Sequence, residues 1–139
     1  MTIKNRISVI SILLVGILIA SVGGCKKYDE GPSVSLRSKT DRLAHTWLLD
    51  NYRVNSNDYT SVIGDYTETF SKDGGYFYSG GGSSGTGRWE FRNKNEEIWL
   101  TGVGTQSPKI LYILKLEEGK FWYYYMDGNN DHEFHMFHN

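Results

Sequence analysis

Three histidines near the C-terminus have the residue type and spacing that a metal site could use. His132, His135 and His138 lie three residues apart. On a helix they would share one face, and imidazole nitrogen is a common zinc ligand. The surrounding residues alternate as in a β-strand, which places His132 and His138 on one face and His135 on the other. We therefore expect no metal ion or other cofactor at this cluster.

Residues 127–131 could form part of a calcium-binding loop. Their sequence, Asp-Gly-Asn-Asn-Asp, fits the first five positions of such a loop. The sixth position should be glycine and the twelfth glutamate, but this chain has His132 and His138 there. Asn, Asp and Gly are also typical of tight turns. We favour a hairpin turn, and calcium binding is the alternative.

The glycine-rich segment 80–85 matches two catalytic motifs by its letters alone. Gly-Gly-Gly-Ser-Ser-Gly fits the dinucleotide-binding pattern G-x-G-x-x-G, and its last five residues fit the nucleophile elbow G-x-S-x-G. Both motifs require a helix to follow the glycines. Residues 86–91 alternate like a strand instead. We interpret 80–85 as the flexible tip of a hairpin, predict no catalytic residue, and expect that the protein is not an enzyme.

Cys25 has the most specific chemistry in the sequence. A basic start and an apolar run over 7–22 lead into two glycines and then the cysteine. This order is typical of a secretory signal peptide. A cysteine directly after small residues further predicts a lipobox, in which residues 1–24 are removed and the Cys25 sulfur carries lipid. A retained transmembrane helix is the alternative, because a span needs about 20 apolar residues.

The chain after Cys25 divides into a tether and a domain. Residues 25–35 are charged and contain Gly-Pro, which is typical of a linker, and residues 36–139 form the domain. Lys26 follows the cysteine, where an Asp would retain a lipoprotein at the inner membrane of many bacteria. The tether resembles those of outer-membrane lipoproteins of the Bacteroidota. This resemblance implies an exported protein anchored to the outer membrane by its lipid, with exposure at the cell surface as a further hypothesis.

Charge and cysteine content exclude several classes of function. The formal net charge of −1 provides no basic surface for nucleic acid. Cys25 is the only cysteine, and the predicted lipid would consume it, so we expect neither a disulfide nor a thiolate nucleophile. Aromatic residues make up 14% of the chain, which is enough for a sizeable core in a small domain.

The positions of these residues depend on a predicted all-β domain. Ser38-Lys39-Thr40-Asp41 resembles a capping box and predicts a short helix ending near Ala44. From His45 onward the apolar period is two, with Asn, Asp and Gly turns between segments. Short connections favour antiparallel neighbours, and about eight strands favour an up-and-down barrel. The predicted strands cover 46–54, 65–71, 75–79, 86–92, 96–101, 109–116, 121–126 and 132–138.

One predicted hairpin assigns residues to the two faces. A four-residue loop at 117–120 places Leu116 opposite Phe121 and Lys115 opposite Trp122. Without a bulge, steps of two residues then place Leu114 and Tyr112 inside, opposite Tyr123 and Tyr125. The remaining residues predicted to face inward are Trp47, Leu49, Phe70, Tyr76, Tyr78, Trp89, Phe91, Ile98 and Leu100.

Residues 36–138 resemble a known family. The chain is similar to lipocalins, and to small lipocalin-like lipoproteins of the Bacteroidota, in three places: His45-Thr46-Trp47, residues 66–76 with the Lys72-Asp73-Gly74 turn, and residues 87–91. Lipocalins begin with Gly-x-Trp, where this chain has His45 in place of the glycine. They also cover that tryptophan with an arginine near the last strand, and this chain has no arginine after Arg92. The resemblance implies a barrel that binds apolar molecules.

Two functions follow from these observations. The first is binding of a small apolar or aromatic molecule inside the barrel, because tyrosines offer flat apolar faces with polar tips. The alternative is an accessory subunit, or interaction protein, whose barrel core is filled. Its partner, or a second copy of the chain, would bind an outer patch formed by Trp99, Ile113, Trp122 and Tyr124, unless the N-terminal helix covers that patch. The candidate ligand-facing residues are Tyr76, Tyr78, Tyr112, Tyr123 and Tyr125.

Overall fold

The computed structural model describes residues 37–139, and these belong to one compact unit. The predicted signal peptide, Cys25 and the tether lie outside the described residues. Within the described part, no helix combines the length and the apolarity that crossing a bilayer requires.

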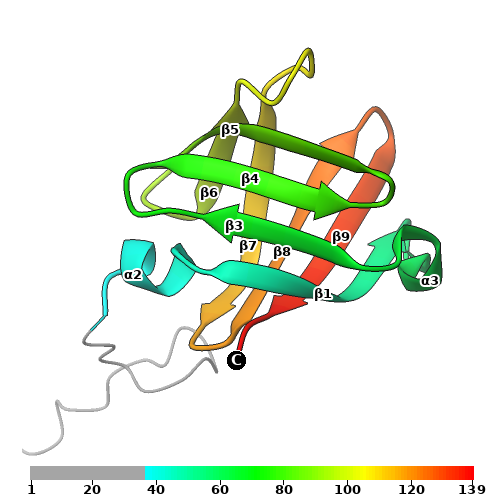
Figure 1. The fold of residues 1–139 in the computed structure, drawn as a ribbon, viewed down its shortest axis with the longest axis horizontal. Helices are drawn as coiled ribbons and strands as arrows, with labels where there is room; N and C mark the ends of the chain where they lie inside the picture. The colour runs from blue at the N-terminus through cyan, green and yellow to red at the C-terminus, as the bar shows by residue number, and fades with distance from the viewer. Residues whose placement is uncertain (1–36) are drawn as a thin grey trace, which may run out of the picture. The chain divides into compact units, whose positions relative to one another are not determined.

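The strands form a closed antiparallel barrel, which confirms the predicted fold class. Neighbours follow the order β1-β3-β4-β5-β6-β7-β8-β9, and β9 pairs back with β1 (Figure 1). The short β2 pairs only with β1. The elements are α2 (Lys39–Leu43), β1 (Thr46–Val54), β2 (Asn57–Asp58), α3 (Thr60–Ile63), β3 (Tyr66–Phe70), β4 (Gly75–Gly80), β5 (Ser83–Arg92), β6 (Glu97–Thr101), β7 (Lys109–Glu117), β8 (Lys120–Asp127) and β9 (Asn130–Phe137).

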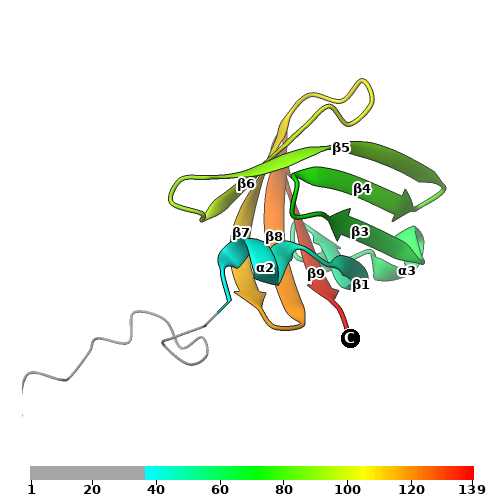
Figure 2. The ribbon, with the colours of Figure 1, turned by 60° about the vertical axis from the view of Figure 1, so that its left-hand side comes forward.

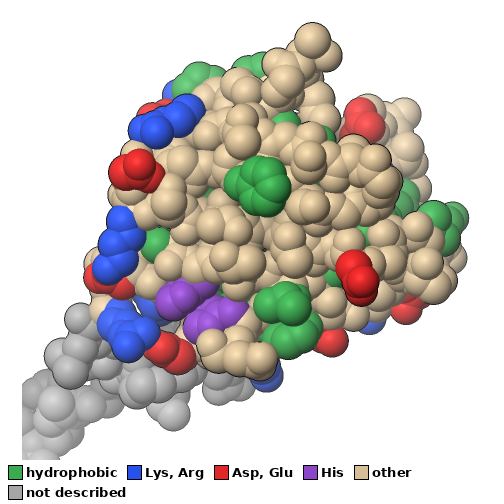
Figure 3. All heavy atoms as spheres, viewed as in Figure 1, with side chains coloured by type: hydrophobic (Ala, Val, Ile, Leu, Met, Phe, Trp, Pro, Cys, Tyr) green, Lys and Arg blue, Asp and Glu red, His purple; other side chains and the backbone are tan. Residues whose placement is uncertain are grey.

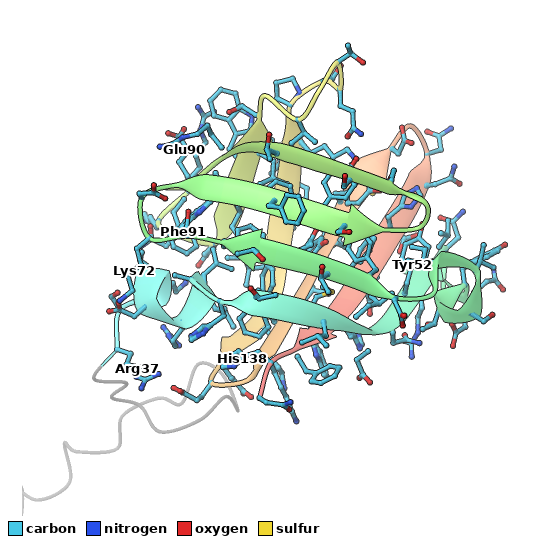
Figure 4. The ribbon with its side chains drawn as sticks, viewed as in Figure 1. Arg37, Tyr52, Lys72, Glu90, Phe91 and His138 are labelled. Carbon is cyan, nitrogen blue, oxygen red and sulfur yellow. The ribbon has the colours of Figure 1, made fainter. Side chains whose placement is uncertain are left out.

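Helix α2 begins at the predicted cap and packs against the barrel core. The Ser38 hydroxyl accepts a hydrogen bond from the Asp41 backbone N–H at 3.0 Å. The Asp41 carboxylate also binds Lys72 Nζ at 2.6 Å, which ties the helix to the β3–β4 turn (Figure 4). On the other side of the helix Leu43 is fully buried. A helix of this length is unstable alone, so this packing holds it in place (Figure 2).

The barrel interior near α2 is filled by large side chains. Trp47 is fully buried, and its Nε1 donates a hydrogen bond to the Leu43 carbonyl oxygen at 2.9 Å. Its ring lies 5.5 Å from that of Phe121, which in turn meets Phe70 edge-on at 5.7 Å. Because Trp47 and Phe70 are both buried among these rings, their predicted inward positions are confirmed. Figure 1 shows that α2 lies at one end of β1 and α3 at the other.

Two histidines pack beside the Trp47 ring. His138, directly after β9, packs edge-on against the Trp47 ring at 4.7 Å. His45 stacks on His138 at 3.9 Å, and Figure 3 shows a pair of histidines together near α2. An imidazole from directly after the last strand thus covers the Trp47 ring.

This histidine pair predicts a pH dependence of folding. Burial, followed by the nearby His138, lowers the pKa of His45 below its usual value, while Glu118 and the Asp41 backbone oppose this shift. The unfolded chain then takes up a proton near pH 6.5, before the folded chain does. Stability should therefore fall as the pH drops below about 6.5. Chemical denaturation between pH 7 and 5 should show that His45→Gln loses less unfolding free energy than the wild type. An equal loss in both proteins would contradict the assignment of this pH dependence to His45.

A bulge in β7 corrects part of the predicted register. Leu116 pairs with Phe121 and Lys115 with Trp122 as predicted, but the register shifts between Ile113 and Lys115. The extra residue is Leu114, whose side chain is 43% exposed. Beyond the bulge Ile113 packs against the core, and Tyr112 pairs with Tyr124 on the outer face. The predicted inward positions of Leu114 and Tyr112 are therefore wrong, because one inserted residue reverses the alternation.

The bulge predicts mutational effects of different size at two leucines of one strand. Leu111→Ala should cost about 2–5 kcal/mol of unfolding free energy, because Leu111 is only 1% exposed. Leu114→Ala should cost less than about 1 kcal/mol, since Leu114 is 43% exposed and leaves no enclosed cavity when shortened. Urea denaturation measures both. Equal losses would contradict the bulged register.

The glycine-rich hairpin is shorter than the sequence suggested. Gly80 pairs with Ser83, so that only Gly81 and Gly82 form the turn, both with positive φ. Ser83, Ser84 and Gly85 belong to β5. The prediction of a six-residue flexible tip at 80–85 is therefore wrong, although the strand that follows the glycines is confirmed.

Candidate functional site

The barrel interior contains a cavity of about 190 Å³. Its lining residues come from each strand from β3 to β9 and from the β6–β7 loop, whereas Trp47 and Leu43 do not line it. Its opening is marked by exposed lining residues of β5 and of the β6–β7 loop. The lining residues are Tyr66, Glu68, Tyr76, Tyr78, Ser83, Leu100, Val103, Gln106, Ser107, Lys109, Leu111, Tyr123, Tyr125 and Phe134.

A buried carboxyl group, Glu68, is the central polar feature of this cavity. Strand alternation on β3 points Tyr66, Glu68 and Phe70 inward, and Glu68 is 2% exposed. Three tyrosine hydroxyls donate to its Oε1: Tyr76 at 2.7 Å, Tyr123 at 2.9 Å and Tyr66 at 3.0 Å. The Tyr123 hydroxyl also lies 3.0 Å from Oε2. The carboxyl group thus gathers hydrogen-bond donors from β3, β4 and β8.

Burial sets the protonation of this cluster. Desolvation raises the pKa of Glu68, while the hydrogen bonds from Tyr76, Tyr123 and Tyr66 and the charge of Lys109 act in the opposite direction. Desolvation, reinforced by the nearby Glu68, also raises the pKa of Tyr123 well above its ordinary value. Tyr66 and Tyr76 have raised pKa values for the same reasons. All three phenols therefore stay protonated and serve as hydrogen-bond donors.

Six of the fourteen residues that line the cavity are aromatic, and several of the others are polar. Phe134 stacks on Tyr123 at 5.2 Å and lies 5.7 Å from Tyr66. Tyr125 extends this wall, and the Lys109 ammonium lies 4.7 Å from the Tyr125 ring centroid. A guest molecule would thus meet flat aromatic faces together with polar groups, among them Glu68 and Lys109.

Two glycines on the inner face of β5 leave space for neighbouring side chains. A Cβ at Gly85 would lie 2.7 Å from Tyr78 Cε1, and one at Gly87 would lie 2.7 Å from Val103 Cγ2. Both contacts are closer than carbon atoms tolerate. Glycine at these positions therefore lets Tyr78 and Val103 lie directly against β5, where both line the cavity.

The structure brings together most of the predicted ligand-facing tyrosines. Tyr76, Tyr78, Tyr123 and Tyr125 line the cavity. Tyr112 does not, because the β7 bulge turns it outward, where it stacks on Tyr124 at 4.9 Å. Whether the four lining tyrosines bind a ligand stays a prediction.

Sequence reasoning missed Glu68, although a signal for it was present. Phe70 was placed inside, and strand alternation then places Glu68 on the same face. An acidic residue between two inward aromatic residues needs hydrogen-bond donors or a counterion, or belongs to a functional site, because burying a charge is costly. That signal indicates a polar centre, but it does not identify the three tyrosines that surround it.

The predicted outer patch is present only in part. Ile113 faces the core, so it does not contribute. Arg92 lies over the Trp99 ring at 3.1 Å, and Trp122 contacts both the Lys115 ammonium at 4.5 Å and the His135 ring at 4.1 Å. These polar side chains break the apolar surface into smaller areas. Partner binding here stays a prediction.

Helix α2 does not cover the patch, because its buried residue Leu43 belongs to the barrel core. The opposite face of the molecule, built on β1, β3 and β4, carries only scattered apolar side chains (Figure 3). Phe77 and Leu48 are its half-exposed examples.

The C-terminal histidines lie on both faces of β9, as predicted. His132 accompanies the inward Phe134, stacks on Tyr125 at 4.9 Å and shares a hydrogen bond of 2.7 Å with the Tyr52 hydroxyl. His135 lies on the outer face against Trp122. Within residues 37–139, no three His, Cys, Asp or Glu side chains are grouped as a metal site would require.

No protein-family model matches the sequence, and no curated protein matches it either. The functional argument therefore rests on the barrel and its cavity.

Proposed function

We propose that this protein is an exported, lipid-anchored, lipocalin-like protein that binds a small single-ring molecule inside its barrel. The observation that carries the proposal is the cavity of about 190 Å³, which has six aromatic residues and Glu68 among its lining residues. An apolar protein cavity of about 150 Å³ is large enough for benzene. The present cavity suits a ring with one short substituent. It favours ligand binding over the alternative of an accessory subunit with a filled core.

The membrane anchor in this proposal is the lipid on Cys25. One acyl chain binds a membrane only marginally, whereas two or more hold a protein firmly. Cys25→Ala should therefore prevent processing and remove the protein from the outer-membrane fraction. The intact mass of the extracted wild-type protein provides the second readout. A mass that still includes residues 1–24 would contradict the anchor.

Native mass spectrometry of protein extracted from its own membrane tests ligand binding. We expect the wild type to carry the added mass of one small molecule. Ser83→Trp should abolish that mass, because Ser83 lines the opening of the cavity. Ser84→Trp is the matched control, since the next residue of β5 faces the other way and should leave the added mass unchanged. A bare wild-type protein, or an added mass that Ser83→Trp retains, would contradict the proposal.

A further inference from the structure

Glu68 has unused hydrogen-bonding capacity beside an open cavity. Its Oε1 accepts three hydrogen bonds from tyrosines, but Oε2 accepts only the longer one from Tyr123. An ionised carboxylate has about four acceptor sites and no donor. The carboxyl group lines the cavity together with these tyrosines. A guest that complements the ionised form of Glu68 must therefore bring a donor.

The surroundings favour a donor that carries a positive charge. Within residues 37–139, no salt bridge joins Glu68 to a basic side chain, and the Lys109 ammonium lies over the Tyr125 ring instead. A buried carboxylate is costly without a counterion, since water no longer solvates it. Aromatic faces attract cations through their ring quadrupoles, and Tyr66, Tyr123 and Phe134 provide such faces. An anionic guest would instead face repulsion in a medium of low dielectric constant.

We propose that the guest is a single-ring organic amine, bound as its ammonium ion with the N–H groups donating to Glu68 and the ring among the tyrosines. This assignment rests on the proposed ligand-binding function and names the chemical class of the ligand. The site should bind an amine more tightly than an alcohol, because charge-assisted hydrogen bonds to a buried carboxylate are stronger than neutral ones. Lys109, near the opening, limits the affinity by repelling the guest.

Isothermal titration calorimetry with three single-ring probes of similar size tests the assignment. Benzylamine and benzyl alcohol have the same number of non-hydrogen atoms and differ in the charge and donors of the substituent, and benzoate is the anionic probe. We expect wild-type protein to bind benzylamine at least about tenfold more tightly than benzyl alcohol, as the strength of a hydrogen bond to a charged group implies. Benzoate should not bind measurably.

Two variants locate the amine at Glu68. Glu68→Gln has the same shape without the charge, so it should lose the preference for benzylamine while still binding benzyl alcohol. Lys109→Met should bind benzylamine more tightly than the wild type. Circular dichroism establishes that both variants are folded. If Glu68→Gln does not fold, the comparison of the three probes on the wild type still tests whether the site prefers an amine.

The outcomes separate this inference from the proposed function. Preference for the amine, lost in Glu68→Gln, supports both. Equal binding of benzylamine and benzyl alcohol, or a preference that Glu68→Gln keeps, overturns the amine assignment while ligand binding stands. If none of the three probes binds the wild type, both proposals fail.

Discussion

Replacing Trp47 with alanine is expected to lower the free energy of unfolding by about 3–5 kcal/mol. Trp47 is fully buried, donates a hydrogen bond to the Leu43 carbonyl oxygen and packs on Phe121 and His138. The substitution removes these contacts and leaves a large void where α2 joins the barrel. A small domain has a total stability of about 5–15 kcal/mol, so much of it would be lost. Urea denaturation followed by fluorescence or circular dichroism measures the change.

Trp122→Ala is the matched control for this prediction. Trp122 lies on the outer face, where it contacts His135 and Lys115 rather than the core. Its loss should cost no more than about 1.5 kcal/mol, the upper range of an exposed aromatic contact. If Trp122→Ala destabilises the protein as much as Trp47→Ala, the assignment of inner and outer faces would be wrong.

Replacing Glu68 with leucine is expected to cost about 2–4 kcal/mol of stability, because it leaves buried tyrosine hydroxyls without an acceptor. Tyr66, Tyr76 and Tyr123 all donate to this carboxyl group. Glu68→Gln is the matched control. It keeps an acceptor oxygen of nearly the same geometry and should cost less. If the leucine variant is as stable as the glutamine variant, the three hydrogen bonds contribute little.

The raised pKa of Glu68 makes the stability of the folded protein depend on pH, and the direction of this dependence follows from the shift. In the unfolded chain Glu68 ionises near pH 4.3, whereas burial delays its ionisation in the folded chain. Between these two pKa values the folded state binds more protons, so stability falls as the pH rises. Wild-type protein should therefore lose stability relative to Glu68→Gln as the pH increases above about 4.3. A difference that grows in the opposite direction would contradict the raised pKa.

The sequence predicts the architecture because its local signals agree with one another. Period-two alternation, Asn, Asp and Gly turns and the Ser38 cap all indicate short antiparallel strands after a brief helix, and the structure contains them. The short helix α3 was not predicted, since Thr60–Ile63 carries no side-chain cap hydrogen bond and has little amphipathic pattern. Its Asp58–Thr60 hydrogen bonds hold the turn between β2 and β3 instead.

The candidate site was predicted less completely than the fold. One inserted residue, Leu114, reverses the facing of Tyr112 and Ile113, and no turn or glycine in β7 signals the bulge. The tyrosines of β4 and β8 were placed correctly because their strands run without interruption. The cluster around Glu68 depends on contacts between β3, β4 and β8 across the barrel, and such contacts follow from closure of the sheet rather than from any local pattern.

The central claim is that a small molecule binds in the cavity next to Glu68. Methyl NMR of leucine-labelled protein, titrated with benzylamine and benzyl alcohol, tests it most directly. The account predicts saturable shifts of the Leu100 and Leu111 methyl groups, which line the cavity, with little change at Leu116 in the filled part of the core. Absence of saturable shifts at Leu100 and Leu111, or shifts confined to the exposed Leu48 and Leu114 on the outer surface, would contradict it.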